Sequence, residues 1–199
     1  IIFAFACVGV LFLMYDFGTA LIFFFTFIVI SFMRSGDIRT LVLVCTVALM
    51  GGLIVLMFRP YVANRFAAYG HVWEYFDTTG YQQTRTMIYS ASGGLFGVGL
   101  GNGELRDIFA ATEDLVFGVV CEEFGMIMAG AILLSYVALL VYSIRHSKYA
   151  RSSFYAICAC AASSLMLFQA SLNVFGVNDI LPLTGVTLPF ISRGGSSVI

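Results

Sequence analysis

The chain has 199 residues, of which 60% are hydrophobic and 11% are charged, and its formal net charge is −1. Because roughly a quarter of the residues of a soluble protein are charged, this composition excludes a soluble globular domain and indicates a polytopic membrane protein. The ten Lys and Arg residues are scattered along the chain, which argues against a nucleic-acid partner.

Five apolar segments approach or reach the length of about 20 residues that crosses a bilayer. In chain order they are residues 1–14, 18–33, 40–58, about 116–143 and about 153–176. We expect them to form one all-α domain, a polytopic membrane helix bundle, because no repeat or low-complexity linker separates them. The first segment lacks the basic region of a signal peptide, and we expect the sequence to be a fragment of a longer bundle.

Two short basic loops predict how the bundle is oriented. Residues 34–39 carry two arginines, and residues 145–151 carry two arginines and a lysine. Short basic loops face the cytoplasm. Alternation of the spans then places residues 15–18, 59–114 and 177–195 on the outer side.

The long outer segment, residues 59–114, is expected to contain short helices, one of them amphipathic over residues 81–92. Loops of this length without a role are uncommon. Snorkelling to the membrane interface explains any one of its arginines. All four, together with the nearby acids and Trp73, fit a site for an anionic, lipid-linked group. The four are Arg59, Arg65, Arg85 and Arg106.

Glycines follow the predicted amphipathic helix. They lie at Gly93, Gly94, Gly97, Gly99, Gly101 and Gly103. Their spacing matches neither GxGxxG nor a P-loop, so no nucleotide site is predicted. Glycine tolerates positive φ and lets another backbone or a ligand approach closely. A tight re-entrant turn and a substrate-contacting turn both remain open.

Acidic residues cluster between the glycines and the fourth apolar segment. Glu113 and Asp114 fall where that helix is expected to begin, which is the usual place for a helix cap. Asp114 also adjoins the apolar run LVFGVV, and a half-desolvated carboxylate there can act as a general base. Glu122 and Glu123 lie farther along, so the lipid-facing part of the helix is expected to begin close to Phe124.

The stretch LPLTGVTLPFISRGGSS, residues 181–197, places two prolines around Thr184 and Thr187. Irregular backbone at membrane depth persists only where it is buried in protein or lines a wet cavity. This re-entrant segment is therefore either a packed plug or one wall of a site. Gln169 and Asn173 share a face of the preceding helix, where they serve either as inter-helix hydrogen-bonding groups or as ligands.

Several of these motifs resemble those of the SEDS family, the bacterial shape, elongation, division and sporulation proteins. GGLFGVGLGNG, EDLVFGVVCEEFG and LPLTGVTLPFISRGGSS occur in the family's order. YDFGTA is similar to the family's PDLGTA element, and GYQQTRTMIYSASGG is similar to its GYQ…S stretch. The resemblance covers nearly the whole sequence. It implies a fold of ten membrane helices, of which this piece holds helices five to nine and the start of ten.

The resemblance implies a peptidoglycan glycosyltransferase of the bacterial cytoplasmic (inner) membrane. Such a protein polymerises lipid II on the outer face, with a class B penicillin-binding protein that cross-links the product and with other division or elongation proteins. The family's catalytic Asp, in TDF, maps to Asp114 in EDL. Glu113 replaces the usual Thr, which leaves open which acid is the base, and Arg193 replaces the usual Tyr. Thr187 favours the division and sporulation branches over the rod-elongation branch.

In the mechanism that this resemblance implies, Asp114 takes the proton from the 4-hydroxyl group of the acceptor sugar. Arg65 and Arg85 would neutralise the pyrophosphate leaving group, with a divalent cation (Mg²⁺ or Mn²⁺) held by other acids as a further candidate. A helix cap is the default explanation for Asp16. Asp16 is nevertheless predicted to lie on the outer side of the membrane, as is the long segment 59–114. The remaining candidate substrate-binding residues are Tyr81, Gln82, Gly99, Gly101, Glu104, Thr184, Thr187 and Asp16.

Two functions of other classes stay open. A flippase or transporter of lipid-linked precursors also uses broken helices and acids. It would place charged groups near the middle of the membrane, however, and segments 18–33, 40–58 and 153–176 contain no Asp, Glu, Lys, Arg or His. A non-catalytic membrane scaffold of the division machinery would tolerate replacement of Asp114 and Arg65.

Overall fold

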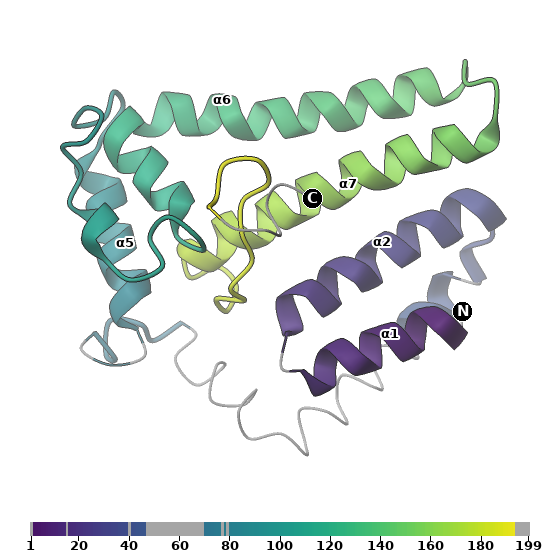
Figure 1. The fold of residues 1–199 in the computed structure, drawn as a ribbon, viewed down its shortest axis with the longest axis horizontal. Coiled ribbons are helices and arrows are strands. Elements are labelled where there is room, and N and C mark those ends of the chain that lie inside the picture. The colour runs from purple at the N-terminus through teal and green to yellow at the C-terminus, as the bar shows by residue number, and fades with distance from the viewer. Residues whose placement is uncertain are drawn as a thin grey trace. The chain divides into compact units, whose positions relative to one another are not determined.

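The computed structural model describes residues 2–14, 16–39, 41–46, 70–76, 78 and 80–193 (Figure 1). Every regular element in these ranges is a helix, and no strand occurs in them. The elements are α1 (Ile2–Leu13), α2 (Phe17–Ser35), α5 (Tyr81–Ser92), the 3₁₀ helix η1 (Leu105–Asp107), α6 (Val116–Ser147) and α7 (Ser153–Val177). The predicted all-α fold class is confirmed.

Three of these helices, α2, α6 and α7, are long and apolar enough to cross a membrane. They are the helices expected of a multi-pass membrane protein. α6 begins at Val116 and α7 at Ser153, the residues at which the fourth and fifth spans were predicted to begin. Residues 41–46, the described part of the predicted third span, are also helical.

The chain divides into two compact units, and the first comprises Ile1–Asn64 and Ala138–Phe168. Within this unit α1 packs against α2. The rings of Phe25 and Phe168 stack with their centroids 4.0 Å apart. Aromatic side chains therefore contribute to the contact between α2 and the part of α7 that belongs to this unit.

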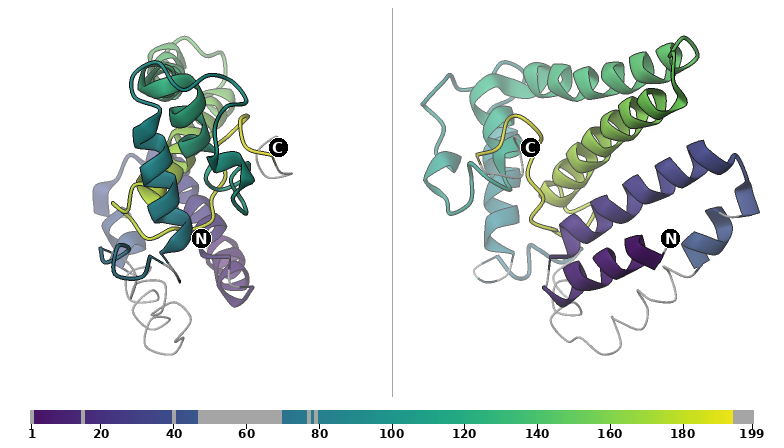
Figure 2. Two further views of the ribbon diagram at one scale, coloured as in Figure 1. Left: turned by 90° about the vertical axis from the view of Figure 1, so that its left-hand side faces the viewer. Right: turned by 45° about the vertical axis from the view of Figure 1, so that its right-hand side comes forward.

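The second unit comprises Arg65–Val137 and Gln169–Ile199. Within it α6 is broken at Gly125, whose φ of 82° and ψ of 170° lie outside the helical region. The short first part of α6 turns away from the long part that follows (Figures 1 and 2). The break lies next to Phe124, where the lipid-facing part was predicted to begin.

A small hydrophobic core joins the two parts of α6 to α7 and to the C-terminal segment, residues 178–193. Its buried side chains are Phe117, Val120, Cys121 and Ala129, and Ile132, Leu133, Val174 and Ile191 pack around them. Figure 2 shows the C-terminal segment, in yellow, beside the beginning of α6. This packing brings residues that are far apart in the chain to one place.

Candidate functional site

The backbone carbonyl groups of residues 112–114, directly before α6, each accept a hydrogen bond from another part of the second unit. The N–H group of Arg193 donates to Thr112 (2.8 Å), the hydroxyl group of Ser192 to Glu113 (2.6 Å) and the side-chain amide of Asn173 to Asp114 (2.8 Å). Two of these donors come from the C-terminal segment and one from α7. The backbone at Asp114 is therefore fixed by contacts from two elements.

The same amide of Asn173 also donates to the carbonyl oxygen of Val186 at 2.6 Å. Gln169, one helical turn earlier on α7, donates to the carbonyl oxygen of Thr187 at 2.9 Å. Irregular backbone within a membrane protein needs such partners for its polar groups. Gln169 and Asn173 are therefore hydrogen-bonding groups, but their partners lie in irregular backbone and not, as expected, on another helix.

The side chain of Asp114 lies next to the backbone of the re-entrant segment at Gly185. A Cβ atom built on Gly185 would lie 3.4 Å from Oδ2 of Asp114, and the φ of Gly185 is +71°. Only glycine adopts this conformation readily, so the turn can approach the carboxylate closely. Asp114 is half-buried whereas Glu113 is exposed, which distinguishes the two adjacent acids.

A strained turn leads into this site. Ala110 has a φ of 63°, a left-handed conformation that is uncommon for a residue with a Cβ atom. Its carbonyl oxygen accepts hydrogen bonds from the N–H groups of Glu113 (3.0 Å) and Asp114 (3.1 Å). The turn thus sets the direction in which the chain enters α6. Strain of this kind persists only where the surrounding contacts hold it.

Residues 93–103, which we call the glycine loop, wrap around the break in α6. Breaking a helix leaves carbonyl groups on one side and N–H groups on the other without helical partners, and the loop supplies both. Val98 and Gly99 donate to the carbonyl oxygens of Glu122 (2.9 Å) and Glu123 (3.1 Å), while Gly94 and Leu95 accept from Met126 (3.0 Å) and Ile127 (3.4 Å). A Cβ atom on Gly97 would collide with the carbonyl oxygen of Glu123. The loop is therefore a tight turn with close backbone approach, and the substrate contacts of Gly99 and Gly101 stay predictions.

The buried carboxylate of Glu122 caps η1. Its two oxygens accept hydrogen bonds from the N–H groups of Glu104 (2.8 Å) and Leu105 (3.0 Å). The carboxylate of Glu104 in turn accepts a hydrogen bond from the hydroxyl group of Tyr89, which raises the pKa of Tyr89 above its ordinary value. Glu104 thus belongs to a structural network, and its contact with substrate stays a prediction.

The guanidinium group of Arg85 makes cation–π contacts with two aromatic rings. The central carbon of its guanidinium group lies 5.1 Å from the ring centre of Phe76 and 5.6 Å from that of Tyr81. Cation–π contacts of this kind orient a guanidinium group without using its N–H donors. Gln82, the neighbour of Tyr81, donates to the carbonyl oxygen of Phe109 at 3.3 Å. The cation–π contact thus joins two of the predicted substrate-binding residues, Arg85 and Tyr81.

Three other predicted residues have different outcomes. Arg65 lies outside the described residues, so its phosphate contact stays a prediction. Asp16 belongs to the first unit, where its Oδ1 accepts a hydrogen bond from the N–H group of Thr19 (3.1 Å) as the N-cap of α2. Thr184 is half-buried in the re-entrant segment. The structure brings Asp114 together with Gly185 and leaves the ligand contacts of these three residues as predictions.

Two buried residues of the second unit were not singled out from the sequence. Ser192 accepts a hydrogen bond from the N–H group of Leu188 at 2.7 Å and donates to Glu113. It lies in the Pro/Gly-rich segment, where a hydroxyl group often satisfies nearby backbone groups, so a signal for it existed. Gln83 donates to the carbonyl oxygen of Gly176 at 2.6 Å. No local pattern separates it from the adjacent Gln82.

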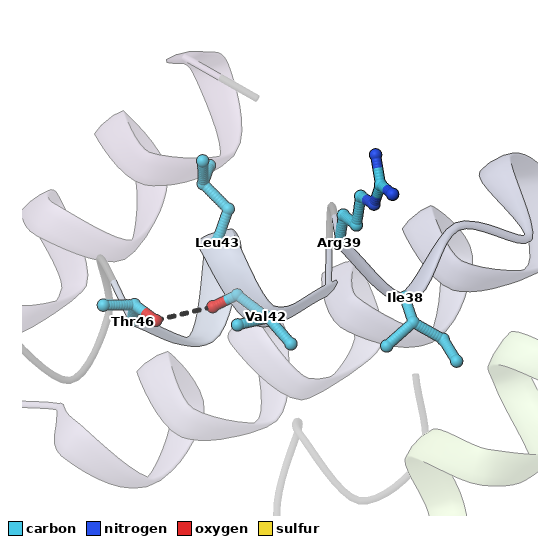
Figure 3. A pocket seen from close by; sticks show the side chains of 5 residues that line it. All are labelled: Ile38, Arg39, Val42, Leu43 and Thr46. Carbon is cyan, nitrogen blue, oxygen red and sulfur yellow. Dashed lines mark hydrogen bonds between the residues drawn. The ribbon is translucent and has the colours of Figure 1, made fainter.

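Within the described ranges, no three His, Cys, Asp or Glu side chains gather in the manner of metal ligands. A shallow pocket in the first unit is lined by Ile38, Arg39, Val42, Leu43 and Thr46 (Figure 3). The hydroxyl group of Thr46 is bonded to the carbonyl oxygen of Val42 at 2.7 Å, so the lining is mainly apolar with one guanidinium group. This lining includes none of the predicted site residues.

Comparison with known proteins gives one family for the whole chain. The family of FtsW, RodA and SpoVE, described as "Cell cycle protein", matches residues 1–199. The peptidoglycan glycosyltransferase RodA of Mycobacterium tuberculosis is 32% identical over 192 residues, which are 96% of this chain and 41% of that protein. Stage V sporulation protein E of Bacillus subtilis is 31% identical over 185 residues, which are 92% of this chain and 50% of that protein.

One similar solved structure bears the description "Structural coordination of polymerization and crosslinking by a peptidoglycan synthase complex". It superimposes with a TM-score of 0.71 at 26% sequence identity, over 98% of this chain and 55% of that one. The present chain thus spans about half or less of the length of the two curated relatives. With the fold and the family match in agreement, the chain belongs to the FtsW, RodA and SpoVE family of cell cycle proteins.

Proposed function

We propose that the full-length protein is a peptidoglycan glycosyltransferase that polymerises lipid II, with Asp114 as its general base. The observation that carries this proposal is the fixed placement of Asp114. Its backbone carbonyl group is bound by Asn173, and its half-buried carboxylate lies next to the glycine turn at Gly185. Relatives that are about a third identical and are named peptidoglycan glycosyltransferases support the assignment.

In the proposed reaction the carboxylate of Asp114 accepts the proton of the acceptor sugar's 4-hydroxyl group. The hydroxyl oxygen then forms a bond to C1 of the donor sugar, and the bond between C1 and the phosphate oxygen breaks. The lipid-linked pyrophosphate leaves with the electron pair. General-base catalysis of this kind contributes typically about a hundred- to ten-thousand-fold in rate, provided that the base is held within hydrogen-bond distance of the proton.

The pyrophosphate needs positive charge, because its negative charge increases as the bond to C1 breaks. Arg85 supports this role, since Phe76 and Tyr81 hold its guanidinium group in place. Arg65 is proposed for the same role on the basis of the sequence. A divalent cation (Mg²⁺ or Mn²⁺) would supply further charge at the phosphate oxygens. Mg²⁺ keeps several waters and takes few protein ligands when it binds phosphates, so no large cluster of acids is needed.

The partner that we propose is a class B penicillin-binding protein, which would cross-link the glycan strands. Support comes from the similar solved structure, whose description couples polymerization with crosslinking in one synthase complex. The proposed location is the bacterial cytoplasmic membrane, with the site on its outer face. The basic loops at residues 34–39 and 145–151 support this orientation.

The experiment is a polymerisation assay with the purified full-length protein, its transpeptidase partner and lipid II. We expect glycan strands from the wild-type protein and polymerisation about a hundred- to ten-thousand-fold slower from the Asp114→Asn variant. Translocation of lipid II across vesicles is measured with the same preparations. A wild-type protein that moves lipid II without polymerising it would instead be a flippase. A preparation that does neither, while binding its partner, would be a scaffold.

A further inference from the structure

The glycine loop presents apolar side chains to its surroundings. Phe96 is 83% exposed and Leu95 is 62% exposed. No Asp, Glu, Lys or Arg occurs between Arg85 and Glu104 in the sequence. Such a combination is unfavourable in water, and its contact partner must be apolar.

Hydrogen bonds fix the backbone that carries these two side chains relative to α6. The carbonyl oxygens of Gly94 and Leu95 accept bonds from the N–H groups of Met126 (3.0 Å) and Ile127 (3.4 Å), which begin the long part of the helix. On the other side of Phe96, Val98 donates to the carbonyl oxygen of Glu122 (2.9 Å), before the break. Phe96 therefore lies at the level of the break.

The length of α6 places this level in the bilayer. At a rise of about 1.5 Å per residue, residues 126–147 measure about 33 Å, close to the hydrocarbon thickness of about 30 Å. Arg145 and His146 lie in the last turn, where charged and polar side chains mark the opposite interface. Met126 is therefore expected at the hydrocarbon boundary on the other side. The exposed side chains of Leu95 and Phe96 lie at the same level, because Gly94 and Leu95 are hydrogen-bonded to Met126 and Ile127.

We propose that Leu95 and Phe96 insert into the bilayer at this boundary and anchor the glycine loop to the lipid. The glycine loop, which supplies hydrogen-bond partners at the break in α6, would thereby also fix the depth of the outer segment in the membrane. The partner is the acyl-chain region of the lipids just below their headgroups. This anchoring does not depend on the proposed enzymatic activity.

The test uses the full-length protein reconstituted in phosphatidylcholine vesicles whose acyl chains carry bromine either near the headgroup or near the chain end. Bromine quenches tryptophan fluorescence on contact. Phe96→Trp is compared with Leu134→Trp, an exposed position on α6 about 12 Å deeper by the same rise per residue. Subtracting the parent protein removes the fluorescence of Trp73 and of any other tryptophan.

We expect the fluorescence added by Phe96→Trp to be quenched more strongly by bromine near the headgroup than by bromine near the chain end. For Leu134→Trp the order should be reversed, and Leu95→Trp should behave as Phe96→Trp does. Absence of quenching at position 96 with either lipid would overturn the proposal. A long-wavelength emission would then assign the side chain to water, and a short-wavelength emission would assign it to a protein contact. Stronger quenching by bromine at the chain end would contradict the assigned depth.

Discussion

At the scale of single residues, the placement of Asp114 comes from the backbone around it. The carbonyl groups of residues 112–114 are all bound, by the Arg193 N–H group, the Ser192 hydroxyl group and the Asn173 amide. Fixed backbone on both sides restricts the orientation of the carboxylate, which a general base needs for proton transfer. Glu113 contributes its carbonyl group to this arrangement, while its side chain is exposed.

We therefore expect Asn173 to contribute more to the free energy of unfolding than Asn178, which lies farther along the chain. In Asn173→Ala the carbonyl groups of Asp114 and Val186 lose their donor. We expect the variant to lose about 2 kcal/mol of unfolding free energy, since an unpaired buried polar group costs about 1–3 kcal/mol. Any polymerisation activity should fall with it, because Asp114 is no longer held. Asn178→Ala removes only an exposed bond to Val174 and should cost less than about 0.5 kcal/mol.

Thermal unfolding of the two full-length variants in the same detergent is the measurement. Equal losses in the two proteins would show that the buried bonds of Asn173 contribute nothing beyond an ordinary surface hydrogen bond. A loss of activity in Asn173→Ala that is accompanied by an unchanged midpoint of unfolding would assign the residue to ligand contact instead.

At the scale of elements, the break in α6 and the glycine loop form one structure. The break frees backbone groups around Gly125, and the loop binds them through residues 94–99. Since unpaired backbone groups in a membrane protein are costly, neither part is stable without the other. Glu122, which lies in α6, also caps η1, so hydrogen bonds connect the outer segment to α6 at several points.

Two glycines of the loop test this dependence. Both Gly97 and Gly94 have positive φ, +82° and +57°, but a Cβ atom at Gly97 would collide with the Glu123 backbone, whereas nothing lies within 4 Å of one at Gly94. Gly94→Ala should therefore cost only the conformational penalty of about 1–2 kcal/mol. Gly97→Ala should cost clearly more, because backbone must move. Thermal unfolding of the full-length variants measures the difference, and equal stability would mean that the close approach is not required.

Local sequence patterns predicted some of these elements and not others. The helix predicted over residues 81–92 is α5, because its amphipathic pattern is complete within twelve residues. The pairing of the glycine loop with the break could not be predicted, since its hydrogen bonds join residues far apart in the chain. The same holds at the site. Asp114 was singled out by family resemblance, but the bonds of Ser192 and Arg193 that position it depend on the packing of the C-terminal segment.

At the scale of the whole molecule, the chain corresponds to only part of the length of its relatives. It spans 41% and 50% of the two relatives described above. Helices α2, α6 and α7 are those that can cross the membrane within the described ranges. The orientation of these helices decides whether Asp114 can meet the proposed substrate, a lipid-linked sugar, on the outer face.

This orientation is tested with two equally exposed positions, Phe109 (85%) and Tyr149 (83%). Phe109 precedes α6 and Tyr149 follows it, so a membrane-spanning α6 should place them on opposite sides. In the full-length protein, Phe109→Cys should react with a membrane-impermeant maleimide in intact spheroplasts. Tyr149→Cys should react only after the membrane is opened. The reverse pattern would place the candidate site in the cytoplasm.

The proposed role of Asp114 as the base is tested most directly by the initial rate of lipid II polymerisation in two matched variants of the full-length protein. Asp114→Asn and Glu113→Gln each remove one of the two adjacent carboxylates while keeping the size of the side chain. We predict that Asp114→Asn lowers the rate about a hundred- to ten-thousand-fold while Glu113→Gln stays within a few-fold of wild type, with both variants still bound to the transpeptidase. A near-wild-type rate for Asp114→Asn, or the larger loss in Glu113→Gln, would contradict the assignment.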